Sequence, residues 1–320
     1  MSWLRERLAS ARIRRTIQII VTLLILAFFG LALYDIAPKL ATYNWQLEPG
    51  WLLVALVILV VRGPLPVWGW WLILRKLGYR VSFRKSTRIV YYSALAAYLP
   101  GSMWHYVGRV YLAEKEGVPK LRGIISIAIE SVLILLAALA VAGLSLAAWP
   151  DPPLWAAALA LVLLVGVIWR PDLFFKLVDW GLQRIGRKPL GVSLSSKDVL
   201  EILVPFVLNW ISFGLIFFAL LAALYPGLSL MYIPAVSGIF TAAWVGGYLA
   251  IVVPQGLGVR EFIIVTLLAV LGVPAPVATA AALLARLWSI LGAGVWGAIS
   301  AGLREKGATP DEARVGSDQM

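Results

Sequence analysis

The stretch 124–149 reads IISIAIESVLILLAALAVAGLSLAAW and contains a single charged residue, Glu130. The run exceeds the ~20 residues that an α-helix needs to cross the hydrocarbon core of a bilayer, so it predicts a transmembrane helix. The whole chain is similar in character: of its 320 residues 61% are hydrophobic and 14% are charged, and the mean hydropathy is +0.89. Soluble domains carry about 45–50% apolar residues. Composition therefore argues against a soluble enzyme and against a disordered chain.

Further apolar runs, separated by Pro, Gly or charged residues, predict the other membrane segments. They are 16–34, 51–74 with an interruption at 62–66, 89–99, 104–112, 154–169, 199–224, 231–253, 260–271 and 275–302. We interpret the chain as an all-α, polytopic integral membrane protein with about six to eight membrane helices. Residues 1–303 form a single transmembrane domain in this prediction, and 304–320 form a short, polar, disordered tail on the cytoplasmic side.

The basic residues predict the orientation. Lys and Arg number 28 against 16 Asp and Glu, which gives a net charge of +12. Most of them fall in five groups, located at the N-terminus and at 75–88, 109–122, 170–197 and 304–314. Clusters of this kind mark cytoplasmic loops of membrane proteins. We therefore expect a multi-pass protein of the cell membrane with both termini in the cytoplasm, and no nucleic-acid partner.

All five basic groups can face the cytoplasm only if the chain between Arg88 and Arg109 enters the membrane and returns. Eleven residues of helix span about 16 Å, roughly half of the hydrocarbon core. Ile89–Leu112 is therefore predicted as a re-entrant hairpin with Pro100-Gly101 at its tip. The break at Pro254-Gln255-Gly256 is either the tip of a second hairpin or the end of a full span over Met231–Val253. Functional sites are often built at such breaks.

Two stretches share an order of features, which predicts an inverted repeat. The first contains Tyr98-Leu99-Pro100, Gly108-Arg109, Gly117-Val118-Pro119 and Glu130; the second contains Tyr248-Leu249, Pro254, Gly258, Arg260, Gly272-Val273-Pro274 and Arg286. The first stretch starts from the predicted cytoplasmic side and the second from the opposite side. Many secondary transporters follow this plan. The alternative is that these are unrelated Pro and Gly kinks.

Four arginines are candidates for binding an anion. Arg62, Arg260 and Arg286 lie inside apolar runs, and Arg109 lies in the first hairpin. A charge at the bilayer centre costs about 2.5–3.5 kcal/mol on insertion scales, so such residues normally face a protein interior and a partner. A guanidinium offers a planar fork for phosphate oxygens, and a helix N-terminus adds free amides.

The N-terminal amides that would assist these arginines are expected at the two breaks, from Gly101, Ser102, Gly256 and Gly258. Glu130 and Glu261 are the acids expected at comparable depth to balance charge. Glu130 is predicted to pair with an arginine from the other half of the chain, such as Arg286. In the alternative interpretation the arginines make only structural pairs with these acids and with backbone carbonyls.

Catalytic signatures are missing from the sequence. It has no cysteine, no Gly-x-Ser-x-Gly elbow, no phosphate-binding loop and no His-Glu-x-x-His pair. We expect no enzyme activity, no catalytic residue, no cofactor and no metal site. His105 is the single histidine and lies next to the first break, where it is a candidate proton relay; a structural hydrogen bond is the alternative.

These residues resemble a known family. Leu99-Pro100-Gly101 with Gly108-Arg109, Glu130, the stretch 254–261 (PQGLGVRE) and Arg286 are similar to the flippase-like transmembrane family named after lysylphosphatidylglycerol synthase, over about residues 10–303. The resemblance implies an integral-membrane domain that translocates lipids. In bifunctional members a soluble aminoacyl-transferase domain follows this membrane part; aminoacyl transfer is not expected of the present sequence.

The sequence thus leads to one preferred function and two alternatives. The preferred function is translocation of an anionic phospholipid or a polyprenyl-phosphate-linked lipid, whose phosphate is held by the four arginines. The alternatives are a secondary transporter of a small organic anion and an intramembrane lipid-modifying transferase. Expected partners are membrane lipids, the anionic lipid substrate and a separate enzyme that synthesises this lipid. The sequence leaves the oligomeric state open.

Overall fold

The computed structural model describes residues 38, 40–95, 104–149, 154–184, 186, 189, 191–250 and 256–302. These residues form helices and no strand, which confirms the all-α prediction. In chain order the α-helices are α2 (Pro49–Arg62), α3 (Pro64–Lys76), α4 (Phe83–Leu95), α5 (Trp104–Glu114), α6 (Lys120–Ser145), α7 (Leu154–Trp169), α8 (Pro171–Arg184), α9 (Ser196–Leu224), α10 (Ile233–Leu249), α11 (Val259–Val270) and α12 (Ala275–Gly302). Short 3-10 turns follow α6 and precede α10.

Within the described part of the chain, five segments are long and apolar enough to cross a membrane. They are Pro49–Lys76, Lys120–Ala148, Ser196–Leu224, Leu230–Leu249 and Ala275–Gly302, and a shorter apolar helix ends at Trp169. The first of them is interrupted at Gly63, where two prolines follow closely in the sequence, so α2 and α3 are separate helices. The predicted span 16–34 and the predicted tail 304–320 lie outside the described residues. The multi-pass prediction is confirmed.

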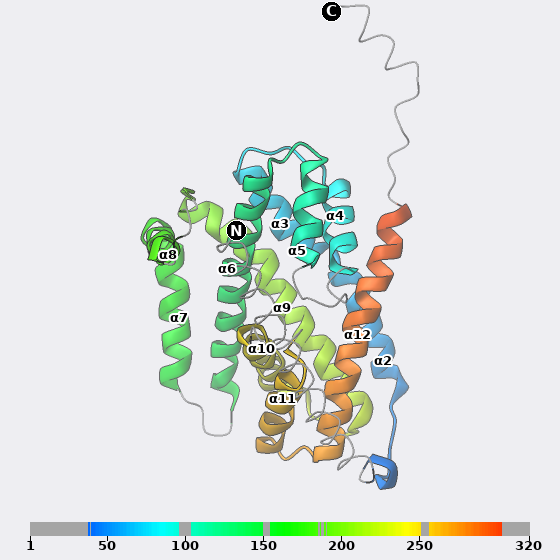
Figure 1. The fold of residues 1–320 in the computed structure, drawn as a ribbon. Helices are drawn as coiled ribbons and strands as arrows, with labels where there is room; N and C mark the ends of the chain where they lie inside the picture. Colours follow the sequence, from blue (N-terminus) through cyan, green and yellow to red (C-terminus); the bar gives the residue numbers. More distant parts are fainter. Residues whose placement is uncertain are drawn as a thin grey trace, which may run out of the picture.

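The helix α9 is the centre of the bundle. It packs against α2, α3, α6, α10 and α12, and Figure 1 shows it crossing the bundle diagonally between the other long helices. Its buried side chains include Phe206, Trp210 and Phe217, and the indole N–H of Trp210 donates to the carbonyl of Ile134 on α6 at 2.9 Å. Burial of such large apolar side chains fixes the positions of the surrounding helices.

Short helices lie at opposite ends of the bundle. Helices α4 and α5 pack on each other at the upper end of Figure 1, whereas α11 lies at the lower end and packs on α10 and α12. With 13 and 11 residues, α4 and α5 are each too short to cross a bilayer at ~1.5 Å per residue. In addition, α10 packs on α6 and α12 packs on α4. The tip predicted at Pro100-Gly101 lies outside the described residues, so the re-entrant hairpin stays a prediction.

The same turn follows each of the two short helices α5 and α11. Gly117 (φ 84°) and Gly272 (φ 76°) adopt the left-handed conformation that ends each helix. After each glycine a buried valine donates its backbone N–H back into the helix, Val118 to Ala113 at 3.1 Å and Val273 to Leu268 at 3.1 Å. A proline then precedes the long helix α6 or α12. These two turns are the sequence Gly-Val-Pro in both places.

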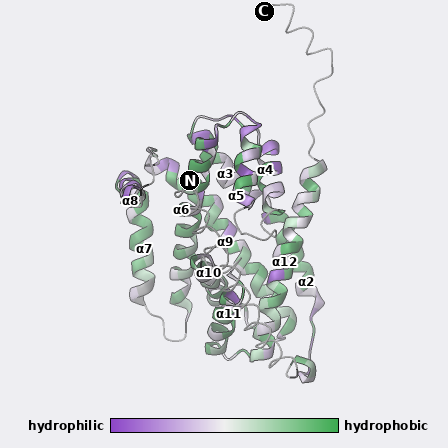
Figure 2. Cartoon of the chain, viewed as in Figure 1, coloured by the Kyte–Doolittle hydropathy of each residue, from purple (hydrophilic) through white to green (hydrophobic). Residues whose placement is uncertain are grey.

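Polar side chains gather at one end of the bundle. Figure 2 shows purple segments around α3, α4, α5 and α8 at the upper end, while the long helices are mostly green. Lys76 on α3 contacts Asp198 at 2.5 Å and Glu201 at 2.6 Å on α9, and Lys85 on α4 contacts Glu116 after α5 at 2.9 Å. These ion pairs connect the ends of neighbouring helices on the side predicted to be cytoplasmic.

The helix α8 was not predicted. Its sequence lies in the fourth basic group, and its apolar residues do not form a continuous run. Figure 1 shows α8 roughly perpendicular to α7, at the same end as α3 and α4. Leu173 and Trp180 are exposed on it, at 52% and 57%. A short amphipathic helix with this placement is typical of a helix that lies in the membrane interface.

Candidate functional site

Arg109 and Glu130 form a buried ion pair. Arg109 on α5 donates from Nη1 to the Glu130 carboxylate on α6, and its Nε donates to the hydroxyl of Ser93 on α4 at 3.4 Å. Both charged residues are 9% exposed. The guanidinium carbon lies 5.5 Å from the ring centroid of Trp70 on α3. The pair and its contacts thus join α3, α4, α5 and α6 inside the apolar bundle.

The prediction that Glu130 pairs with an arginine of the other half, such as Arg286, is wrong. The tight turn at Gly117 brings α5 back against α6, so that Arg109 reaches Glu130 within one half of the chain. Arg286 on α12 instead donates to Glu261 on α11, from Nε at 2.8 Å and from Nη2 at 2.6 Å. Figure 2 shows small purple segments on α11 and α12 within otherwise green helices.

Glu261 also caps its own helix. Its second carboxylate oxygen accepts the backbone N–H of Gly258 at 2.8 Å. The Gly258 amide was predicted to bind a phosphate, but in this structure a side-chain carboxylate occupies it. Gly256 (φ 62°) lies so close to α10 that a Cβ there would be 2.6 Å from the Gly247 Cα. Gly101 and Ser102 lie outside the described residues.

Arg260 follows Val259 at the start of α11 and contacts α10, whereas Glu261 contacts Arg286 on α12. Its side chain runs along Gly247 of α10, where an added Cβ would be 2.5 Å from the Arg260 Cγ. The guanidinium carbon is 5.6 Å from the ring centroid of Trp244. Trp244 in turn stacks on Tyr248 with ring centroids 5.0 Å apart. Arg260 thus belongs to an aromatic group at the end of α10.

A hydrogen bond between two tyrosines links the two halves. Tyr106 on α5 is hydrogen-bonded through its side chain to Tyr248 on α10, and it also lies within electrostatic reach of Glu130 and Arg109. His105 is its neighbour, with ring centroids 3.7 Å apart. The described ends of the two predicted breaks are therefore in contact. The proton relay through His105 stays a prediction.

Arg62 lies at the interruption between α2 and α3 and is partly buried. Its Nη2 donates to Asn209 Oδ1 on α9 at 2.5 Å, and its guanidinium carbon is 3.6 Å from the ring centroid of Phe213. Its Nε is buried and has no hydrogen-bond partner among the described residues. Among the residues that the structure describes, no carboxylate forms an ion pair with Arg62, whereas Arg109 and Arg286 each pair with a glutamate.

Several residues of these groups were missed by the sequence analysis. They are Ser93, Tyr106, Asn209, Phe213 and Trp244, while Tyr248 was named as part of the repeat and not as a site residue. Asn209 could have been found, because it is a buried amide in the middle of the apolar run 199–224. The tyrosines and Trp244 give no such signal, because aromatic residues are frequent throughout this chain: it contains 15 Trp, 11 Tyr and 11 Phe.

Comparison with protein families identifies the chain. Residues 15–297 match the family described as the lysylphosphatidylglycerol synthase TM region. The chain belongs to this family. The resemblance inferred from the sequence is therefore confirmed, and the membrane helices described above are those of a lysylphosphatidylglycerol synthase TM region. It is a membrane protein related to lipid handling. A search of curated proteins gave no match.

Proposed function

We propose that this lysylphosphatidylglycerol synthase TM region translocates an anionic lipid, a phospholipid or a polyprenyl-phosphate-linked lipid, across the cytoplasmic membrane. The observation that carries the proposal is the contact of Tyr106 with Tyr248 beside the Arg109–Glu130 pair. Together these four side chains form a polar cluster inside an apolar bundle, and both halves of the chain contribute to it. A lipid head group needs such a polar route between leaflets, because the hydrocarbon core offers no hydrogen bonds.

The two halves form an inverted repeat in this proposal. The turns at Gly117 and Gly272 are alike in sequence, in backbone conformation and in hydrogen bonding. The contacts are reciprocal, since α10 packs on α6 and α12 packs on α4. In each half an ion pair joins the short helix to the long one, Arg109–Glu130 and Glu261–Arg286, with the order of charges reversed. Rocking of one half against the other would expose the polar cluster to each leaflet in turn.

The orientation in this proposal places both termini in the cytoplasm. Support comes from basic residues in or beside the helix ends at the polar end of the bundle: Lys76, Arg80, Arg84, Lys85 and Lys120. Basic residues are enriched in the cytoplasmic loops of membrane proteins. The interfacial helix α8 lies at the same end and would rest on the cytoplasmic leaflet.

The test is a translocation assay in proteoliposomes. The full chain is reconstituted with a trace of lipid that carries a fluorophore, and a membrane-impermeant reductant destroys the fluorophores that reach the outer leaflet. The panel contains phosphatidylglycerol, phosphatidylethanolamine, diacylglycerol and a polyprenyl phosphate. We expect rapid loss of the inner-leaflet signal for a phosphate-bearing lipid, and the same rate as in protein-free vesicles would contradict the proposal.

Two further readouts separate the alternatives. Uptake of a radiolabelled small organic anion into the same vesicles, without lipid movement, would indicate a solute transporter. Mass spectrometry of the extracted lipids would detect a new covalent product and so indicate a lipid-modifying transferase. Translocation with unchanged lipid mass and without solute uptake supports the proposed function.

A further inference from the structure

The charge of Arg62 is the starting point for an assignment that rests on the proposed function and makes it more specific. A guanidinium has five N–H donors, and among the described residues Arg62 donates one hydrogen bond, to Asn209 Oδ1. Its guanidinium carbon also lies 3.6 Å from the centroid of the Phe213 ring. An amide oxygen and an aromatic ring attract a cation but carry no full negative charge.

Two other interior arginines, Arg109 and Arg286, form ion pairs and so differ from Arg62 in their electrostatic state. Arg109 is neutralised by Glu130, and Arg286 by Glu261. An anion that approached either of them would have to displace or face a carboxylate, and like charges repel. At Arg62 no such carboxylate is paired within the described residues. An incoming anion would therefore gain the full attraction of this guanidinium in a medium of low dielectric constant.

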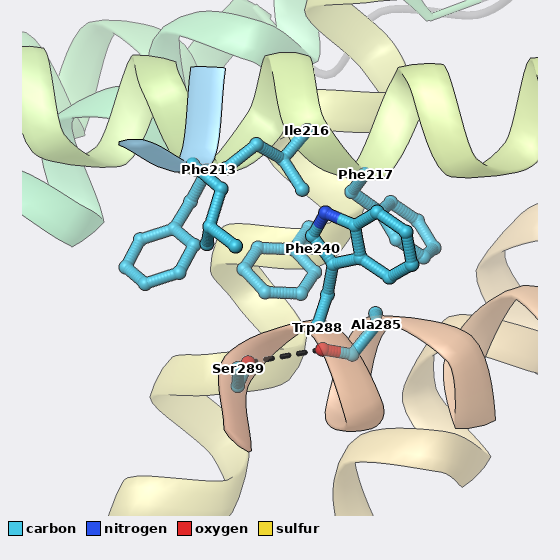
Figure 3. Close-up of a pocket in the computed structure, with 8 residues that line it drawn as sticks. Phe213, Ile216, Phe217, Phe240, Ala285, Trp288 and Ser289 are labelled. Carbon is cyan, nitrogen blue, oxygen red and sulfur yellow. Dashed lines mark hydrogen bonds between the residues drawn. The ribbon is translucent and has the colours of Figure 1, made fainter. Parts of the chain in front are cut away.

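An apolar pocket adjoins Arg62 through the ring of Phe213. The pocket is lined by Leu59 from α2, by Phe213, Ile216 and Phe217 from α9, by Phe240 from α10, and by Ala285, Trp288 and Ser289 from α12. Leu59 is three residues before Arg62 and so lies on the same face of α2. Figure 3 shows aromatic rings from three helices around this space.

One polar donor lies within this apolar lining. Figure 3 shows the indole of Trp288 rising from α12 toward α9, between Phe240 and Phe217. Its Nε1 is buried and has no hydrogen-bond partner among the described residues. A buried N–H without an acceptor is costly, about 1–3 kcal/mol, so an oxygen of a ligand would stabilise it. Ser289 uses its hydroxyl locally, on the carbonyl of Ala285 at 3.0 Å.

We propose that Arg62 and Asn209, together with the neighbouring Trp288, form the binding site for the phosphate of an anionic membrane phospholipid. The phosphate lies on the free N–H groups of Arg62, and an ester oxygen accepts the indole N–H of Trp288. Arg109 and Arg286 are then structural cations, not phosphate ligands.

Binding is measured by native mass spectrometry of the full chain in detergent, titrated with phosphatidylglycerol, diacylglycerol or inorganic phosphate. We expect phosphatidylglycerol to bind most tightly. Arg62→Gln is expected to lower this affinity by about tenfold, because a hydrogen-bonded ionic contact is lost, and to leave that for diacylglycerol unchanged. Trp288→Phe removes the indole N–H donor together with part of the ring, and it is expected to weaken phosphatidylglycerol binding by about threefold.

Asn209→Asp is the decisive variant, because it places a carboxylate on Arg62 and still allows the existing contact. It is expected to fold and to lose phosphatidylglycerol binding to the same extent as Arg62→Gln. Arg80→Gln, an exposed arginine in the loop before α4, is the matched control and should bind as the unmodified chain does. Folding of each variant is checked by its thermal unfolding midpoint without lipid.

Three results would overturn the assignment: unchanged phosphatidylglycerol affinity in folded Asn209→Asp, equal affinity for diacylglycerol, or equally tight binding of inorganic phosphate alone. Its failure is distinguishable from failure of the proposed function. If the chain translocates lipid but its lipid affinity does not depend on Arg62, only the site assignment is refuted. Binding that depends on Arg62 in a chain that moves no lipid supports the site and refutes the translocation.

Discussion

The carboxylate of Glu261 accepts two hydrogen bonds from the guanidinium of Arg286, at 2.8 and 2.6 Å, while its other oxygen accepts the backbone N–H of Gly258. One acidic side chain thus holds the beginning of α11 and the middle of α12 together. Glu261 is 7% exposed, so its charge depends on these donors rather than on water. Glu261 therefore has a structural role, and its substitution should lower the stability of the fold.

We therefore expect Arg286→Gln to lower the free energy of unfolding by about 3 kcal/mol, because the Glu261 carboxylate is left buried without its cation. Glu261→Gln alone should cost a similar amount. The double variant, Glu261→Gln with Arg286→Gln, should recover a large part of the loss, since neither charge remains. Unfolding in detergent micelles measures the effect. Additive losses in the double variant would show that the two residues act independently.

The contact between the halves can be tested by removing single hydroxyl groups. Tyr106→Phe and Tyr248→Phe each delete the hydrogen bond that joins α5 to α10. Each should slow lipid translocation by about fivefold, the effect of one hydrogen bond of about 1 kcal/mol, and the double variant should be no slower than either. Tyr111→Phe is the control, because Tyr111 is 54% exposed on the same helix. Equal slowing by the control variant would refute the role of the contact.

Substitution of Gly63 tests how closely the interruption between α2 and α3 packs against α12. A Cβ at this position would lie 1.7 Å from Cε2 of Trp296 on α12. Gly63→Ala should therefore lower the free energy of unfolding by about 3 kcal/mol, since the indole must move. The Gly63 backbone is helical, with φ −52°, so the cost is steric and not conformational. Gly50→Ala, near the start of α2 and with nothing within 4 Å of an added Cβ, should change stability little.

Replacement of Trp296 by a smaller side chain provides the complementary variant. Trp296→Leu in the Gly63→Ala background should restore part of the lost stability, because the leucine leaves room for the added methyl group. If the double variant is less stable than Gly63→Ala, the clash between these two side chains is not the cause of the loss. Tyr91, which stacks on Trp296 and donates to the Gly63 carbonyl at 2.7 Å, stays unchanged in this comparison.

Lys76 provides a test of the ion pairs at the polar end. It contacts both Asp198 and Glu201, and all three side chains are about a quarter to a third exposed, at 26%, 24% and 38%. Lys76→Gln should lower the free energy of unfolding by about 1 kcal/mol at low salt, and by less at about 1 M salt, where the Debye length is about 3 Å. Arg80→Gln is the control. A loss that does not depend on salt would indicate packing of the lysine stem instead of charge.

Prediction from the sequence succeeded where apolar runs are long and uninterrupted. The runs 124–149, 199–224 and 275–302 correspond to α6, α9 and α12 within a few residues, because spanning a bilayer leaves only one secondary structure for such a run. The amphipathic α8 was missed, because its apolar side chains alternate with Asp172, Lys176 and Asp179 and its length is below that of a span. A search for apolar runs cannot detect a helix of this type.

The candidate site was predicted only in part. The four arginines and the two acids were recognised, because a charge inside an apolar run is costly and therefore stands out. Their partners were not, since Glu130 pairs across 21 residues and Arg62 contacts Asn209 across 147. Pairing depends on how α5 folds back on α6 and on how α9 crosses α2. These are tertiary relations that residue spacing does not contain.

Arg62 is the fourteenth of the 28 residues in the segment Pro49–Lys76, so it lies halfway along that segment. A charge halfway through a membrane experiences about half of the transmembrane voltage, which corresponds to about 1.1 kcal/mol per elementary charge at 100 mV. An anionic ligand bound at this depth has crossed about half of the transmembrane voltage. The rate at which it arrives from one side and leaves toward the other should therefore change with membrane potential, and an applied voltage would bias the direction of movement without any change in the protein.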